Sequence, residues 1–374
     1  MNKQRCFAKI NIDNLIHNFN VVKTLCPDCR IMPVIKADAY SHGAVKIAKA
    51  LVDRADIFAV AEIEEAKQLR RAGIDSDILI LGYTDPACAN ELVCENFIQT
   101  VMSLEYANAL SNNLNGKKLK IHIKIDTGMH RFGFDWENEN TICEIKEIAE
   151  NPRFILDGMF THFSESDNLA SSFTLNQEKR FEKVIDSLLD KGIKIPYLHS
   201  ANSAGVLSHS FSRMNMVRPG IILYGAYPSE NVKKAHLTSH PDLPLKEVMT
   251  MCARVGQIKT IKKGEGIGYS LTHTFEKNST VAVVSAGYAD GIPRALSNKG
   301  EATINGIRFS IAGSVCMDLL MLDITGYEDR IKVGDEVHFW GNDSISVDEY
   351  AKLCDTINYT VYTGVSKRVE KIYE

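Results

Sequence analysis

The sequence predicts an α/β protein in which a closed (β/α)8 TIM barrel is followed by a mostly β C-terminal domain. Eight short apolar runs alternate with amphipathic helical stretches over about 200 residues, a pattern typical of such a barrel. Beyond this region the helical rhythm fails at a Pro-rich stretch, and short alternating strands take over. We therefore expect residues 1–235 to form the barrel and residues 236–374 to form the β domain.

The barrel elements follow one another in a regular order. Cys6–Ile12 alternates like a strand that can join the β domain, and Asp13 is the expected cap of the next helix. Glycines follow the predicted helices Glu62–Ala72 and Phe173–Lys191, where a helix is expected to end. A doubly wound open sheet is the alternative, but the sequence lacks its Gly-rich turn after the first strand. The barrel strands are expected at Ile31–Lys36, Ile57–Ala61, Ile78–Leu81, Ile98–Met102, Leu119–Asp126, Ile155–Thr161, Tyr197–Ser200 and Met214–Tyr224.

The second domain follows a linker that we expect at Gly225–Pro244. Asn305-Gly306 between two apolar runs is a strong signal for a two-residue β-hairpin. A single helix, Ser346–Cys354, is expected to interrupt the strands. Those strands are expected at Val248–Ile261, Thr280–Ser285, Glu301–Ile304, Ile307–Ala312, Leu319–Ile324 and Glu336–Trp340.

Lys36 stands out because it lies at the carboxyl end of an apolar strand. An ammonium group that leaves water without a partner tends to lose its proton. A lysine with a lowered pKa is a nucleophile that bonds carbonyl groups, including the aldehyde of pyridoxal phosphate. The alternative is a strand-end lysine whose ammonium group reaches solvent. This stretch alone does not separate the two interpretations.

Other polar residues also follow the predicted strands. Active sites of such barrels lie at the carboxyl ends of the strands, so these residues are expected to meet. Each has a simpler explanation by itself, such as a helix cap for Ser203 or a surface arginine for Arg131, but their shared position favours a site. The candidates are Lys36, Tyr40, Arg131, His162, Asn202, Ser203 and Arg218.

These candidates match the chemical groups of pyridoxal phosphate. The lysine can hold the aldehyde, and the hydroxyls of Tyr40 and Ser203 can bind the phosphate. The amides near Gly220 and Ile221 lie where such barrels usually bind phosphate. Arg218 can face the pyridine nitrogen. Since an arginine stays protonated, it would keep that nitrogen unprotonated and favour one controlled proton transfer.

Composition argues against several other classes of function. A net charge of −4 gives no general attraction to nucleic acid or to acidic membranes. No stretch reaches the roughly 18 apolar residues of a membrane span, and the first residues lack the apolar core of a signal peptide, so we expect a cytoplasmic protein. Nine cysteines fit reduced thiols. Cys26 and Cys29 have the spacing of a zinc or redox pair. No second CxxC or His pair completes a zinc site and no helical pattern opens at the first cysteine, so we expect an ordinary loop and no metal.

Several motifs resemble those of the alanine racemase family. They follow the family's order from residue 34 to near the end of the chain, so the resemblance covers nearly the whole sequence. The motifs are VIKADAYSHG at 34–43, KIDTGMHRFG at 124–133, THF at 161–163, NS at 202–203, VRPGI at 217–221, GIGYS at 266–270, GYADG at 287–291, CMD at 316–318 and INY at 357–359.

The resemblance implies a pyridoxal phosphate enzyme that interconverts L- and D-alanine, supplies D-alanine for a bacterial cell wall and works as a head-to-tail homodimer. Racemisation removes a proton from one face of a carbon and returns one to the other, so it needs two acid-base groups. Lys36 is implied as one group, and Tyr269 of the partner subunit as the other. By resemblance His162 bonds that tyrosine, and Arg218 bonds the histidine.

Two further basic residues receive roles from the resemblance. Arg131 matches an arginine that contacts the phenolic oxygen of the cofactor and the carboxylate of the substrate. Lys124 matches a lysine that is often carbamylated, and its negative charge would hold Arg131 in place. The alternative is an unmodified lysine inside the barrel that pairs with Asp126 or another carboxylate.

The remaining implied site residues surround the cofactor and the substrate. His162 and Asn202 are expected near the cofactor, together with the residues already assigned to it. Tyr359 resembles the tyrosine that closes the pocket and touches the phosphate. Met317 and Asp318 resemble residues that the partner subunit places beside the substrate.

Three residues depart from the family pattern. Ser41 stands where Gly is usual and Asp38 where Asn is common, and neither change removes a catalytic group. Ser314 replaces an arginine at the substrate entrance, which is expected to blur selectivity. Tyr359 favours alanine because related serine racemases often lack this tyrosine. The alternatives are a serine or broad-specificity racemase, a decarboxylase on the same barrel, and a non-catalytic pyridoxal phosphate carrier.

Overall fold

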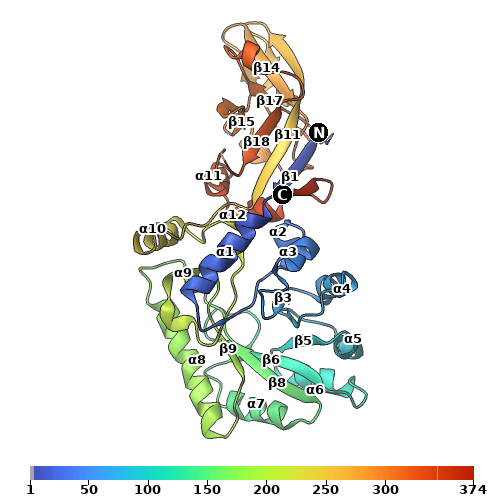
Figure 1. The fold of residues 1–374 in the computed structure, drawn as a ribbon, viewed down its shortest axis with the longest axis vertical. Coiled ribbons are helices and arrows are strands. Elements are labelled where there is room, and N and C mark those ends of the chain that lie inside the picture. The colour runs from blue at the N-terminus through green and yellow to red at the C-terminus, as the bar shows by residue number, and fades with distance from the viewer. Residues whose placement is uncertain (1–3, 343) are drawn as a thin grey trace.

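A parallel barrel and an antiparallel-rich sheet lie at opposite ends of an elongated molecule (Figure 1). The computed structural model describes residues 4–342 and 344–374. The fold class predicted from the sequence is confirmed. Within the described residues, no helix has the length and apolar character needed to cross a membrane.

The barrel strands all run parallel, as the alternation of strands and helices predicts. β10 pairs with β2, Val34 bridges to Ala59 of β3, and the sheet continues in the order β3-β4-β5-β6-β8-β9. The amide of Arg218 donates to the carbonyl of Ala201 at 3.0 Å, which links the last two strand ends. The strands are β2 (Arg30–Ile31), β3 (Phe58–Val60), β4 (Ile78–Ile80), β5 (Phe97–Val101), β6 (Leu119–Asp126), β8 (Phe154–Phe160), β9 (Tyr197–His199) and β10 (Met216–Val217), and β7 (Phe134–Asp135) pairs with β6.

Helices pack around the barrel through their apolar faces. In α8, for example, Phe181, Val184 and Leu188 are buried. Gly73, the second residue after α4, has a φ of +82°, as expected for a glycine that ends a helix. The helices are α1 (Ile12–Leu25), α3 (Ala44–Leu51), α4 (Ile63–Arg71), α5 (Ala89–Cys94), α6 (Leu104–Asn112), α7 (Thr141–Glu150), α8 (Phe173–Asp190), α9 (Ser203–Ser208) and α10 (Glu230–Ser239).

Two predictions about these helices are wrong. The cap of α1 is Asn11, whose side chain accepts from the amide of Asn14, and Asp13 lies inside the first turn. The stretch predicted as a linker contains α10, which Ser229 caps. This helix escaped detection because it is mostly polar and buries only Val232 and His236. The expected domain boundary at 235/236 falls inside α10 and stays a prediction.

The β domain is built on the 13-residue strand β11. β1, at the start of the chain, pairs antiparallel with β11 and parallel with β19, so the two ends of the chain meet here (Figure 1). Asn305 and Gly306 have φ values of +52° and +76° and connect β15 to β16, which confirms the predicted hairpin. The strands are β1 (Cys6–Ile10), β11 (Met249–Ile261), β12 (Gly266–Ile267), β13 (His273–Thr274), β14 (Ser279–Val284), β15 (Glu301–Ile304), β16 (Ile307–Ser310), β17 (Leu320–Asp323), β18 (Glu336–Trp340) and β19 (Glu370–Tyr373).

A second helix follows the predicted one in this domain, so the prediction of a single helix is wrong. α11 (Val347–Leu353) lies where expected, and α12 (Asn358–Thr363) comes after it. α12 is short, and β-branched residues weaken its local helical signal. Tertiary contacts hold it: Asn358 Nδ2 donates to Tyr227 O at 2.7 Å, and Tyr362 Oη donates to Tyr224 O at 3.3 Å. Short 3-10 turns lie at Pro86–Cys88, Ser210–Ser212, Ile221–Tyr224, Tyr269–Leu271, Arg294–Leu296 and Glu328–Arg330.

Candidate active site

A cavity of about 1040 Å³ lies at the carboxyl face of the barrel, because residues directly after several strands line it. It brings together most of the site residues expected from the sequence. Those that line it are Lys36, Tyr40, Lys124, Arg131, His162, Asn202, Ser203, Arg218, Gly220, Ile221 and Tyr359. Tyr269, Met317 and Asp318 do not line it within this chain and belong to the β domain.

Lys36 begins a left-handed turn rather than ending a regular strand. The turn α2 (Lys36–Tyr40) has positive φ angles of 52° to 62° from Ala37 through Ser41. Such angles cost roughly 1–2 kcal/mol per L-residue, and strain of this kind concentrates at functional sites. Ser41 therefore occupies a left-handed position, which glycine adopts more readily than serine does.

The turn is held by carboxylates on both sides. Glu65 accepts from the amides of Ala37 at 2.6 Å and Ala61 at 2.7 Å, and so joins the ends of two barrel strands. Asp38 accepts from the amide of Ala44 and pairs with Lys371 at 3.1 Å. These bonds offset the strain and fix the backbone beneath Lys36.

The electrostatic surroundings of Lys36 favour a reactive amine. Burial lowers its pKa, and the positive charge of Arg131 lowers that pKa further. The carboxylate of Glu65 has the opposite effect on the Lys36 pKa. The lowered pKa agrees in direction with the sequence expectation and suits a nucleophile.

Hydroxyl and amide donors gather on another side of the cavity. The Gly220 amide donates to Ser203 Oγ at 2.9 Å. A Cβ on Gly220 would lie 2.7 Å from Tyr40 Oη, so glycine lets the backbone approach this hydroxyl closely. Asn202 caps α9 by accepting from the amide of Gly205, which orients the turn that carries Ser203. This donor set fits a phosphate group.

Arg218 is only 3% exposed and donates hydrogen bonds in several directions. Nη1 donates to His199 Nδ1 at 2.8 Å, and Nη2 lies 3.4 Å from His162 Nδ1. Further bonds reach the carbonyls of Thr161, His199 and Ser200. Burial lowers the pKa of Arg218 to about 9, so it stays protonated near neutral pH. Within the described residues its Nε has no partner, which leaves one donor for a ligand that faces the cavity.

Lys124 points into the barrel from β6. Its Nζ donates to the carbonyl of Ile125 at 2.9 Å and lies 5.2 Å from the ring centre of Phe160. Burial lowers its pKa to about 7, with the charge of Arg218 adding to the effect. Within the part of the chain that the structure describes, Lys124 pairs with no carboxylate, including Asp126.

Asp126 instead orders the loop that leads to Arg131. Its carboxylate accepts from the amides of Gly128, Met129, His130 and Arg131 at 2.9–3.1 Å. Burial raises the pKa of Asp126, but these hydrogen bonds outweigh it and the net pKa is lowered. The fixed loop places Arg131 at the edge of the cavity.

Tyr269 and its neighbours form an exposed part of the β domain. The Tyr269 side chain is 72% exposed, and Met317 is 52% exposed. Ser314 is 6% exposed and donates to the carbonyl of Tyr269 at 3.2 Å, so in this chain it supports the tyrosine loop. Asp318 bonds Arg368, which also bonds the buried Asp290.

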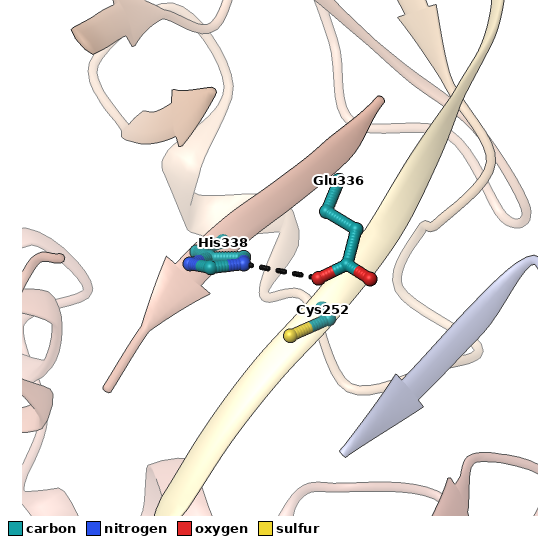
Figure 2. A group of neighbouring side chains, drawn as sticks. All are labelled: Cys252, Glu336 and His338. Atoms are coloured by element: carbon teal, nitrogen blue, oxygen red, sulfur yellow. Dashed lines mark hydrogen bonds and ion pairs between the residues drawn. The ribbon is translucent and has the colours of Figure 1, made fainter. Parts of the chain in front are cut away.

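A second cluster of ligand-type side chains lies in the β domain. Cys252, Glu336 and His338 lie on the adjacent strands β11 and β18, with ligand atoms within 4.8 Å of one another (Figure 2). Glu336 already pairs with Lys9 at 2.6 Å and Arg254 at 3.4 Å. Burial raises the pKa of the Cys252 thiol to about 12, which disfavours a thiolate ligand. These charges favour an ion-pair network, and we assign no metal to it.

The sequence analysis did not identify one glutamate and two histidines that support the residues of the cavity. Glu65 lies inside a helical pattern, where a glutamate normally indicates a solvated face. His199 precedes the Asn202-Ser203 motif, and His122 alternates with Lys124 on β6. The alternation of His122 with Lys124 was the available signal, because residues two apart on a strand share a face.

Comparisons with known proteins identify a family and several relatives that this chain resembles. Sequence models described as the N-terminal and C-terminal domains of alanine racemase match residues 10–228 and 248–373. The alanine racemase of Carboxydothermus hydrogenoformans is 42% identical over 98% of this chain and 99% of its own. A structure of alanine racemase from Clostridium difficile 630 is 39% identical, with a TM-score of 0.94, and covers 100% of this chain and 97% of its own. A Bacillus anthracis alanine racemase with bound L-Ala-P is 31% identical, with a TM-score of 0.91, and covers 100% and 96%.

Proposed function

The chain belongs to the alanine racemase family, and from this premise we propose that it interconverts L- and D-alanine with Lys36 and Tyr269 of the partner subunit as the two acid-base groups. The family consists of isomerases that depend on pyridoxal phosphate. The observation that carries the proposal is the cavity at the barrel mouth, where an amine with a lowered pKa lies near Arg131 and the donors of the phosphate side. A serine or broad-specificity racemase has no such support among the named relatives.

The residues around the cavity fit pyridoxal phosphate. Lys36 would hold the aldehyde, and Tyr40, Ser203 and the backbone at Gly220 and Ile221 would hold the phosphate. When bound, the cofactor supplies an electron sink that acidifies the α-proton of an amino acid. The Nε of Arg218 is available for the pyridine nitrogen, and a protonated arginine there limits how much negative charge the ring accepts.

Each acid-base group has a distinct task in this proposal. Lys36 Nζ takes or returns a proton on one face of the substrate, and burial together with the charge of Arg131 lowers its pKa and so favours the neutral amine. Arg131 orients the substrate carboxylate. Tyr269 Oη of the partner subunit acts on the opposite face. His162 would bond that hydroxyl and favour its deprotonated form, since a tyrosine has an unperturbed pKa of about 10.

The place of Tyr269 supports assembly as a head-to-tail homodimer. The side chain is 72% exposed and does not line the cavity of its own chain, which supports a contribution to the cavity of a second copy. Met317 and Asp318 would enter beside the substrate with it. We also propose a cytoplasmic enzyme, because nine free cysteines suit a reducing compartment.

Incubation of the purified protein with pyridoxal phosphate and L-alanine is expected to yield D-alanine, at a higher kcat/KM than for L-serine. Tyr359 lines the cavity with its ring centre 6.0 Å from that of Tyr40, and we expect its ring to limit the room for a side chain larger than methyl. Tyr359→Ala should therefore move the alanine-to-serine ratio toward serine, by roughly 10- to 200-fold. Absence of D-alanine from the wild-type reaction would exclude racemisation. An unchanged ratio in the variant would exclude Tyr359 as the selecting residue.

Lys124 is expected to carry a carbamate, and the lowered pKa supports this proposal. Carbon dioxide reacts with a neutral amine, and the neutral fraction of Lys124 grows as pH rises through about 7. A protein incubated with 13C-bicarbonate should show a bound carbamate signal in 13C NMR that strengthens from pH 6 to pH 8. Lys124→Arg should lack it, and Lys120→Arg, on the same strand, should keep it. A signal that survives in Lys124→Arg would contradict the assignment.

A further inference from the structure

A line of buried side chains leads from Arg218 into the barrel. Arg218 Nη1 donates to His199 Nδ1 at 2.8 Å, and His199 Nε2 lies 2.9 Å from His122 Nδ1. His122 Nε2 lies 3.5 Å from Asp157 Oδ2, at the outer limit of a hydrogen bond, and has no closer polar partner in the described part of the chain. Both histidines are 0% exposed, while the Asp157 side chain is 20% exposed. The line thus connects the wall of the cavity to a partly hydrated carboxylate.

The ring nitrogen that carries the proton of each histidine in this line follows from Arg218, because a guanidinium group can only donate hydrogen bonds. His199 Nδ1 must accept from Arg218, so a neutral His199 carries its proton on Nε2 and donates it to His122 Nδ1. A neutral His122 then carries its proton on Nε2, which faces Asp157. Burial lowers the pKa of both histidines, so each holds one proton near neutral pH.

The same guanidinium sets the tautomer of the cavity histidine. Arg218 Nη2 faces His162 Nδ1 at 3.4 Å, which leaves the His162 proton on Nε2. Because His162 lines the cavity, that N–H is a donor available to an acceptor there. One end of the line is therefore a proton donor in the cavity, and the other end is the carboxylate of Asp157.

Strand β8 has two irregularities that serve the contact between Asp157 and His122. In the register between β6 and β8, Ile121 faces Leu156 but His122 faces Gly158, so Asp157 is an extra, bulged residue. A β-bulge redirects a side chain, and bulges are rare in parallel pairs. A Cβ on Gly158 would lie 2.5 Å from His122 Cε1, so glycine makes room for the imidazole ring. Neither feature is required by the regular pairing of these strands.

We propose that Asp157, His122 and His199 form a ladder that fixes the tautomers of both buried histidines. The ladder holds the guanidinium of Arg218 and thereby keeps His162 a donor toward the cavity. Its three members are positioning residues, since none of them lines the cavity. The catalytic consequence rests on the proposed function, because the acceptor for His162 is then Tyr269 Oη of the partner subunit. A carboxylate that orients a metal-bound imidazole commonly affects activity by roughly 10- to 100-fold, and we expect an effect of that order here.

Neutron diffraction from deuterated crystals of the holoenzyme tests the tautomers directly. The ladder requires deuterium on Nε2 of His122, His199 and His162, and none on their Nδ1 atoms. Deuterium on Nδ1 of either buried histidine would overturn the proposal. This readout does not depend on turnover, so a protein without racemase activity would refute the proposed function and leave the tautomer test standing.

Kinetics of Asp157→Ala tests what the ladder does. We expect kcat to fall about 10- to 100-fold while KM stays within about twofold of the wild-type value. In a plot of kcat/KM against pH, the limb that reports deprotonation of the tyrosine should move to higher pH. Asp157→Glu, which keeps a carboxylate, should recover part of kcat. The other charged groups that face the ladder, Arg218 or His162 stay unchanged in this variant, and they are Arg30, Lys120, Asp77, Lys124, Glu178, Arg131 and Lys36.

Asp77→Ala is the matched control. Asp77 pairs with Lys120 at 3.1 Å. Its charge affects the pKa of His122 through space, but within the described residues Asp77 makes no hydrogen bond to a member of the ladder. This variant should keep wild-type kcat and its pH profile. An equal loss in Asp77→Ala and Asp157→Ala, or wild-type kcat in Asp157→Ala, would overturn the proposal. If Asp157→Ala does not fold, the neutron result decides.

Discussion

Replacement of Lys36 by alanine is expected to lower kcat/KM by at least about 10⁴-fold, because the covalent hold on the cofactor and one acid-base group are lost together. The visible absorbance of the bound cofactor should disappear with the activity, and reduction with borohydride should no longer attach the cofactor to the protein. The measurement is the rate of L- to D-alanine conversion beside an absorbance spectrum of the purified variant.

Lys46→Ala is the control for this prediction. Lys46 lies on α3, outside the cavity, with its ammonium group 5.8 Å from the ring centre of Tyr373. We expect wild-type turnover and spectrum from it. A Lys36→Ala protein that kept its spectrum after gel filtration would show that another residue bonds the cofactor.

Tyr269→Phe is expected to reduce racemisation by about 10²- to 10⁴-fold, the usual contribution of a positioned acid-base group. Loss of the hydroxyl leaves the ring, so the loop held by the bond from Ser314 to the Tyr269 carbonyl should stay in place. The test compares kcat in both directions for the variant and for Tyr327→Phe, whose tyrosine also lies in the β domain and is 39% exposed. Tyr327→Phe should behave as wild type.

A mixture of Tyr269→Phe and Lys36→Ala proteins tests whether each active site is shared between two chains or built by a single chain. In a head-to-tail dimer the mixed species holds one site with both groups intact. Random reassortment of equal amounts should then restore activity to about a quarter of the sites. If each chain completed its own site, mixing two inactive variants would restore nothing, and that result would reject the proposed dimeric arrangement.

Lys36 shows what local sequence patterns can predict and what they cannot. Its position after an apolar run, with further polar residues after later runs, was enough to expect a site at the carboxyl face of a barrel. The left-handed turn from Ala37 to Ser41 was not predictable, because L-residues disfavour these angles and the compensation comes from Glu65, which lies 28 residues from Ala37.

Helix α12 and the ladder show the same division between local and distant contacts. The local propensity of Asn358–Thr363 is weak, and its helix depends on bonds to Tyr224 and Tyr227 more than 130 residues away. The bulge at Asp157 could not be predicted from β8 alone, because it is defined by the pairing of β8 with β6, where Ile121 faces Leu156 and His122 faces Gly158.

The sequence by itself determined the strand order, the hairpin at Asn305-Gly306 and the family, since apolar periodicity, turn residues and ordered motifs are encoded over short distances. Only the tertiary structure decided which side chains share the cavity and how Arg218 is bound on both sides. It also left Tyr269 exposed, outside the cavity of its own chain. These features depend on residues far apart in the chain, whose contacts exist only once the barrel has closed.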